Sequence, residues 1–270
     1  MTSKRWYYPR LMDPSLDPRA TLDAELAHLR LSTAALLASI EALSDAEVSA
    51  PSLLPDWSRG HVLAHVARNA DGILNLIVWA HTDSPVPMYA SVDTRNGDIE
   101  AGSGLSAELL RVEIAQSAQR VDDALTGVLA LDDASIADIM SRLVQFGAPR
   151  PQAPQVAFSW VPLLRRREVE VHHLDLALTY GPDDWPDDFV VTTLGLVAKR
   201  VAGAQESKVA VLASTPVHGQ AASHWLLSNS TGPTLTGDQG ELLAWLMGRG
   251  TGTSLRMSDD TAIPAPPPWS

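Results

Sequence analysis

The sequence contains no cysteine among its 270 residues. This absence excludes disulfide bonds, cysteine-ligated zinc and a thiol nucleophile supplied by the chain itself. Any thiol chemistry must therefore use a thiol that comes from outside the protein. The absence is also compatible with the cytosol, where disulfides are rare.

Long hydrophobic runs are lacking as well. The most apolar run, ILNLIVWA at 73–80, is far shorter than the roughly 20 residues that span a bilayer. The first 17 residues lack the apolar centre of a signal peptide. We therefore expect a soluble, cytoplasmic protein.

Positive charge is scarce. The chain has 20 lysines and arginines against 32 aspartates and glutamates, which gives a net charge of −12. Such a surface repels nucleic acid and anionic membranes, so neither is expected as a partner. An anionic substrate would need arginines gathered at its site.

Apolar residues make up 45% of the chain, as in folded globular proteins. Helical spacing of leucine, isoleucine and valine predicts four long helices. They are expected at 21–43, 56–81, 106–131 and 162–180. The second would begin near Asp56 or Ser58, both good N-caps, and the fourth would stop at Gly181-Pro182. The connector at 82–103, with two prolines and two glycines, is expected to be a loop, and a loop of that length is usually functional or disordered. A second, proline-rich connector is expected at 145–160. Four long helices in succession favour a helix bundle.

The composition changes after residue 183. A helix at 188–203 precedes two apolar, strand-like segments at 208–214 and 223–229, and another helix ends near Gly248. The predicted fold class is thus α+β. We expect a helix bundle over 1–183 and a smaller α/β domain over 184–270.

Two helices carry histidines at a spacing that suits metal binding. His61 and His65 lie four residues apart on one predicted helix, and Glu168 and His172 have the same spacing on another. This spacing places both side chains of a pair on one helix face. A metalloprotease would have its catalytic glutamate where this chain has Val62. Two imidazoles and one carboxylate from different helices would suit Zn²⁺ and leave one coordination position open, as in catalytic sites.

The spacing alone leaves the ligands undecided. His173 competes with His172, and Glu170 competes with Glu168, although Glu170 lies about 160° around the helix from His172. A Glu–His pair at this spacing is also a common surface ion pair. A histidine on an apolar helix is often a hydrogen-bonded core residue.

Four segments together resemble one protein family. They are DWSRGHVLAHVARNADGILNLIVWAHT (56–82), PMYASVDTRNGDIEAGS (87–103), RREVEVHHLDL (166–176) and GRGTG (248–252). Their sequence and order resemble the mycothiol-dependent maleylpyruvate isomerases, which belong to the DinB-like group of metal-binding helix bundles. The resemblance covers nearly the whole chain. It implies a DinB-like four-helix bundle followed by a smaller α/β domain.

The resemblance also implies the ligands and the chemistry. The zinc ligands would be His65, Glu168 and His172, with His61 as a neighbour one turn away. The implied cofactors are Zn²⁺ and mycothiol, and the substrate is a small anion. The zinc-bound thiolate would add to the double bond of maleylpyruvate, the new single bond would rotate, and elimination would give fumarylpyruvate. This isomerisation belongs to gentisate-type degradation of aromatic compounds.

Two arginines are implied at the active site. Arg249 would be catalytic and bind substrate from the second domain, although an arginine at a helix C-terminus is also favoured by the helix dipole alone. Arg95 would be a second substrate-binding residue. Tyr89 and Asn69 are weaker candidates for the pocket wall. We expect the basic run 165–167 to form a solvated helix face, and one of its members could instead meet an anionic cofactor.

Three other functions remain open from the sequence. A mycothiol S-transferase would use the same zinc and thiol to conjugate an electrophile. A zinc hydrolase would use metal-bound water, but the sequence shows no convincing base for it. A non-catalytic binding protein would have the folded domains without the metal.

Overall fold

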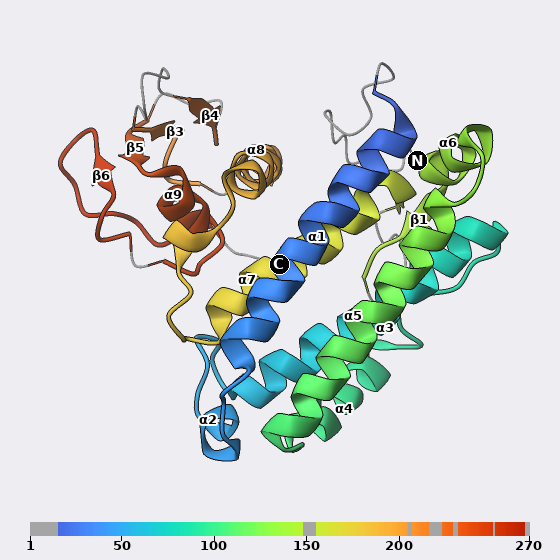
Figure 1. Ribbon diagram of the computed structural model, residues 1–270. Coiled ribbons are helices and arrows are strands. Elements are labelled where there is room, and N and C mark those ends of the chain that lie inside the picture. The colour runs from blue at the N-terminus through green and yellow to red at the C-terminus, as the bar shows by residue number, and fades with distance from the viewer. Residues whose placement is uncertain are drawn as a thin grey trace. The chain divides into compact units, whose positions relative to one another are not determined.

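The computed structural model describes residues 16–147, 155–204, 207–215, 223–228, 232–250 and 252–267. The chain divides into two compact units, residues 1–177 and 178–270. Helices predominate and the strands form two small sheets (Figure 1), so the fold class is α+β as predicted. The division follows Ala177, whereas the sequence analysis placed it after residue 183.

Four long helices build the first unit. They are α1 (Pro18–Ile40), α3 (Arg59–Thr82), α5 (Ala107–Leu129) and α7 (Val161–Asp175). Both α1 and α3 pack against α5 and against α7, so the four helices enclose a common core. Its fully buried aliphatic residues include Leu22, Leu26, Leu36, Ile40, Leu63, Ile73 and Leu76. Burying such side chains stabilises the fold by roughly 1.5–3 kcal/mol each.

The start of α3 is fixed by its first residues. Ser58 is the N-cap, and its hydroxyl accepts the His61 backbone N–H. The His61 ring nitrogen Nδ1 accepts the Ser58 backbone N–H in return, which completes a capping box. Asp56, the other predicted start, has a φ of 63° and lies before the helix. This start places His65 in the second turn.

The expected loop at 82–103 is wrong in its second half. Residues there form α4 (Val92–Ser103), which begins at the N-cap Ser91 and packs against α3. The glycines of this segment suggested a loop, but Gly102 serves helix packing. A Cβ atom at Gly102 would lie 2.9 Å from the Cβ of Ala64, so glycine lets α4 approach α3 closely.

The fourth long helix ends five residues earlier than predicted. Helix α7 stops at Asp175 because Ala177 adopts a left-handed conformation with φ 54°. Arg59 stabilises this ending, since its Nε donates to the carbonyl of Leu176 at 2.5 Å and its Nη2 to that of Ala177 at 3.1 Å. A distant arginine thus replaces the Gly181-Pro182 stop that the sequence suggested.

Short elements connect the long helices. They are α2 (Asp45–Ser49), α6 (Asp133–Ser141), β1 (Leu143–Gln145), β2 (Gln155–Ala157) and the 3₁₀ helix η1 (Phe158–Trp160). Strands β1 and β2 pair antiparallel, where a simple proline-rich connector was expected.

The second unit is a small α/β structure. Its helical elements are η2 (Pro182–Asp184), α8 (Asp187–Ala204) and α9 (Gln239–Leu246). Its sheet has the order β4-β3-β5-β6, with β3 (Val211–Ser214), β4 (His224–Leu226), β5 (Thr234–Gly237) and β6 (Arg256–Met257). Strands β3 and β5 are parallel and the other two pairs antiparallel. Strands β5 and β6 were not predicted because each is too short to show an alternating pattern.

Among the described residues, the helices are too short or too polar to span a bilayer.

Candidate metal centre

Two helices of the first unit bring three potential metal ligands together. Helix α3 supplies His65, and α7 supplies Glu168 and His172 one turn apart. One donor atom from each residue lies within 4.8 Å of the others. The Glu168 Oε2 is 3.3 Å from the His65 Nε2 and 3.7 Å from the His172 Nε2. Donors around a tetrahedral zinc ion are about 3.4 Å apart, so this spacing fits one shared cation.

The protonation of His65 and Glu168 also fits a cation. Burial, together with the neighbouring charge of His172, lowers the pKa of His65 to about 4. His65 is therefore neutral near pH 7, which is the form that binds metal. Burial alone would raise the pKa of Glu168, but hydrogen bonds from His172 and His65 hold it well below its usual range. Glu168 is therefore a carboxylate.

His172 is oriented by a residue that the sequence analysis missed. Its Nδ1 lies 2.9 Å from the Oδ2 of Asp175, which is completely buried. With Nδ1 engaged in this way, Nε2 is directed towards Glu168, as in many carboxylate–histidine–metal sites. Burial alone would lower the pKa of His172, but the hydrogen bonds with Asp175 and Glu168 raise it. The sequence contained a signal for this role, because Asp175 is an acidic residue three positions after the candidate ligand His172 on the same helix.

The other ring nitrogen of His65 faces Arg95. The Arg95 Nη2 lies 3.2 Å from the His65 Nδ1, and the guanidinium carbon lies 5.7 Å from the centre of the Tyr89 ring. Tyr89 in turn hydrogen-bonds Asn69. The structure thus groups the three predicted pocket residues beside His65. Trp57, which the sequence analysis did not single out, packs edge-on against His65 at 5.7 Å between ring centres.

His61 does not belong to the group of three. Its Nδ1 lies 2.8 Å from the Ser58 hydroxyl, and its Nε2 lies 3.2 Å from the Glu100 Oε2. Its ring stacks on Trp57. The histidine at the start of α3 therefore serves the helix cap and lies one turn away from the candidate ligands, as expected.

Glu170 and His173, the alternative ligands on α7, are engaged with α1 instead. Glu170 accepts a 2.5 Å hydrogen bond from the Ser32 hydroxyl, and the His173 Nε2 lies 2.8 Å from the Ser39 hydroxyl. Both residues are 1% exposed. They form part of the packing between α7 and α1.

The expectation of a solvated basic face at 165–167 is wrong for two of its three arginines. Arg165 and Arg166 are each 2% exposed. The Arg165 Nη1 donates to the carbonyl of Val66 and the side chain of Asn69, and the Arg166 Nε donates to Ser32. Helix α7 packs against both α1 and α3, so polar groups on it are buried wherever a partner on those helices satisfies them.

Arg249 lies in the second unit, directly after α9. Its backbone N–H donates to the carbonyl of Ala244 at 2.8 Å, and its Nη1 donates to that of Met247 at 2.9 Å. The intervening Gly248 has a φ of 73°, a conformation that favours glycine. Arg249 is partly exposed, and its role in catalysis stays a prediction.

Comparisons with known proteins agree on one family. The family model described as mycothiol maleylpyruvate isomerase N-terminal domain matches residues 29–177. A crystal structure of the mycothiol-dependent maleylpyruvate isomerase is 27% identical, with a TM-score of 0.78 over 92% of this chain and 97% of that one. The crystal structure of a histidine-to-alanine variant of such an enzyme is 26% identical, with the same TM-score and coverage. No curated protein matches the chain. Because the matched segment is more than half of the sequence and contains all three candidate ligands, the chain belongs to the family defined by the mycothiol maleylpyruvate isomerase N-terminal domain.

Proposed function

We propose that this chain is a zinc- and mycothiol-dependent isomerase that converts maleylpyruvate into fumarylpyruvate. The observation that carries the proposal is the convergence of His65, Glu168 and His172 on one point between α3 and α7. The family match and the 27% identical isomerase support it. In this proposal the four long helices are a DinB-like bundle, and the second unit supplies Arg249.

The donor set suits zinc. Two neutral imidazoles and a carboxylate are ordinary zinc ligands, and three protein ligands leave a fourth position for an exogenous donor. Zinc bound there would keep the sulfur of mycothiol as a thiolate, the nucleophile that makes the substrate's double bond temporarily single. The chain has no cysteine of its own that would compete for that position.

The protein's own residues prepare the site in two ways. Asp175 holds the Nδ1 of His172, which fixes the ring and its tautomer. Arg95 now donates to the His65 Nδ1. If the Nε2 of neutral His65 binds a metal, its Nδ1 carries the proton and cannot accept that bond.

Arg95 would then be released for the substrate. A guanidinium binds a carboxylate through two parallel hydrogen bonds, and maleylpyruvate carries two carboxylates. We assign one carboxylate to Arg95 and the other to Arg249. Trp57 shields one side of His65 with an apolar ring.

The test is turnover of maleylpyruvate by purified, zinc-loaded protein, with and without mycothiol. Isomerisation that needs both zinc and the thiol is expected. A stable thiol conjugate in place of fumarylpyruvate would indicate an S-transferase. Isomerisation at the same rate with and without mycothiol would overturn both functions. Protein that binds no zinc after reconstitution would support a non-catalytic binding protein.

The role of Arg249 needs a separate variant. Arg249→Ala is expected to retain zinc and to lose at least tenfold in kcat/KM for maleylpyruvate. Unchanged kcat/KM would remove the second unit from the proposed active site.

A further inference from the structure

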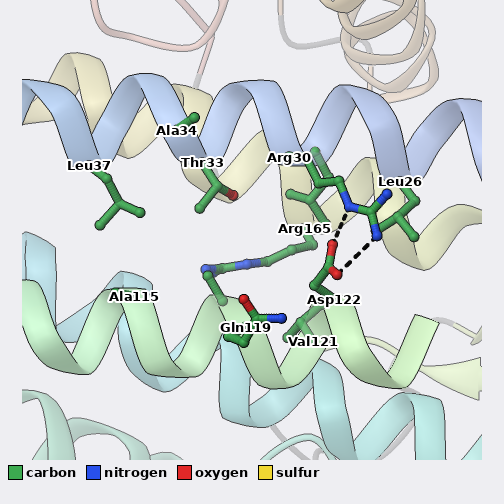
Figure 2. A pocket seen from close by; sticks show the side chains of 12 residues that line it. Leu26, Arg30, Thr33, Ala34, Leu37, Ala115, Gln119, Val121, Asp122 and Arg165 are labelled. Carbon is green, nitrogen blue, oxygen red and sulfur yellow. Dashed lines mark hydrogen bonds and ion pairs between the residues drawn. The ribbon is translucent and has the colours of Figure 1, made fainter. Parts of the chain in front are cut away.

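A cavity between α1 and α5 lies apart from the candidate metal centre. It has a volume of about 180 Å³, and Figure 2 shows its side chains between the two helices. Its lining is mainly aliphatic, with one buried cation. The residues are Leu26, Leu29, Arg30, Thr33, Ala34, Leu37, Ala115, Ala118, Gln119, Val121, Asp122 and Arg165. His65, Glu168 and His172 are not among them.

The buried cation in this cavity is Arg165. Its side chain comes from α7 and extends through the space between α1 and α5 (Figure 2). Both of its hydrogen bonds, to the Val66 carbonyl and the Asn69 amide oxygen, start from Nη1 at 2.8 Å. Within the described chain, Nε and Nη2 form no hydrogen bond and the guanidinium forms no ion pair. The N–H groups of Nε and Nη2 are therefore available to a ligand.

No carboxylate among the lining residues pairs with Arg165. Burial lowers its pKa to about 10, although the charges of Glu168, Tyr89 and Asp71 act in the opposite direction. The carboxylate that lines the same cavity, Asp122, is already paired with Arg30 through two nitrogens of that guanidinium. The charges of Arg30 and Asp122 balance each other, so Arg165 is the one cation of the described lining that has no carboxylate paired with it there.

We propose that this cavity binds a small organic monocarboxylate with an apolar body, of the size of benzoate. The carboxylate would accept hydrogen bonds from the Nε and Nη2 of Arg165, and the apolar body would contact the leucines and alanines of α1 and α5. A cavity of about 150 Å³ in another protein holds benzene, so the volume here suits one ring. A second negative charge would meet Asp122, and the second cation of the lining, Arg30, is already paired with that carboxylate, which disfavours dicarboxylates and phosphates. This site does not depend on the proposed isomerase activity.

The test uses benzoate, with neutral benzamide as the matched control. Zinc-loaded protein with ¹³C-labelled alanine methyl groups is titrated with each compound and followed by NMR. Benzoate is expected to shift the methyl resonances of Ala34, Ala115 and Ala118 in a saturable manner. Benzamide is expected to bind at least tenfold more weakly, because its neutral carbonyl lacks the ionic attraction to the guanidinium and accepts through only one oxygen.

Three variants locate the binding. Ala118→Leu fills the cavity from α5 without touching Arg165, and it is expected to weaken benzoate binding at least tenfold. Arg165→Met, checked for folding by its melting temperature, should do the same. Arg95→Met, which alters a cation beside the candidate metal centre, should leave the binding unchanged. Equal affinity of benzoate and benzamide, full binding by Ala118→Leu, loss in Arg95→Met, or no saturable shift would each overturn the proposal.

Discussion

Helix α7 presents two polar faces, a half-buried one towards α3 and a buried one towards α1. On the first, Glu168 and His172 meet His65 of α3, and their donor atoms face a common point. On the second, Glu170 and His173 are hydrogen-bonded to serine hydroxyls of α1. The residue types are the same, a glutamate and a histidine on each face.

The polar side chains of the two faces differ in their interaction partners. On the α1 face, Ser32 and Ser39 occupy the side chains of Glu170 and His173, so this face contributes to packing. On the α3 face, one potential ligand atom from each of the three residues lies within 4.8 Å of the others, an arrangement that is favourable when a cation lies between them. The two faces carry the same residue types. A metal-binding site therefore differs from a hydrogen-bonded packing contact in how close the potential ligand atoms lie to one another.

The largest expected effect is the difference in zinc binding between variants of Glu168 and of Glu170. Glu168→Gln should lose stoichiometric zinc, since it removes the one carboxylate among the three candidate ligands, while the fold persists. Glu170→Gln should keep full zinc binding but destabilise the fold by about 3 kcal/mol, because Arg166 then loses a buried negative partner 4.0 Å away. Zinc content by mass spectrometry and urea unfolding measure both. Loss of zinc from Glu170→Gln would show that the two faces of α7 do not differ in metal binding.

A smaller effect tests how His172 is held. Asp175→Asn should weaken zinc affinity by about 10–100-fold, because the residue that orients the ligand becomes neutral. Competition with a chromophoric chelator measures the affinity. Ser39→Ala is the matched control on the α1 face, and an equal loss there would show that Asp175 has no special role.

The pH dependence of zinc binding follows from His172. Its pKa is raised above the ordinary histidine value, so the metal-free protein keeps a proton there that zinc must displace. Affinity should be highest above this raised pKa and fall by up to tenfold per pH unit as the pH drops through it. His65, with a pKa of about 4, adds no competition near neutrality. Chelator titrations between pH 6 and 9 (roughly the range in which histidines titrate) would show a flat profile if this assignment is wrong.

The smallest expected effect concerns the α1 face alone. Ser39→Ala removes the partner of the His173 Nε2 and should destabilise the fold by about 1 kcal/mol. Zinc content and kcat/KM should be unchanged. Thermal unfolding and the activity assay detect the difference, and a change in zinc content would mean that the two faces are coupled.

Much of the first unit could be predicted from its sequence. Helical spacing located the four long helices, and local capping preferences narrowed the start of α3 to Asp56 or Ser58, of which Ser58 is the N-cap. The α4 helix was missed since its glycine content imitates a loop, and the reason for Gly102 lies in Ala64 on another helix. The end of α7 was misplaced for a similar reason, as Arg59 holds carbonyls more than a hundred residues away.

The candidate site was predicted only in part. The i,i+4 spacing of Glu168 and His172 follows from the helix repeat, and the family resemblance selected His65 over His61. Burial of Arg165 and Arg166 could not be predicted, because a run of three arginines on a helix normally faces water. Their partners, Val66, Asn69 and Ser32, come from other helices.

By itself the sequence determined which residue types are available and which of them share a turn of helix, since these depend on neighbours along the chain. It also determined that any thiol chemistry must use a thiol from outside the chain, since the sequence has no cysteine. Only the tertiary structure decided which face of α7 meets α3, and therefore which glutamate and which histidine converge with His65. Helix packing sets that rotation through contacts between segments a hundred residues apart, and no local pattern encodes those contacts.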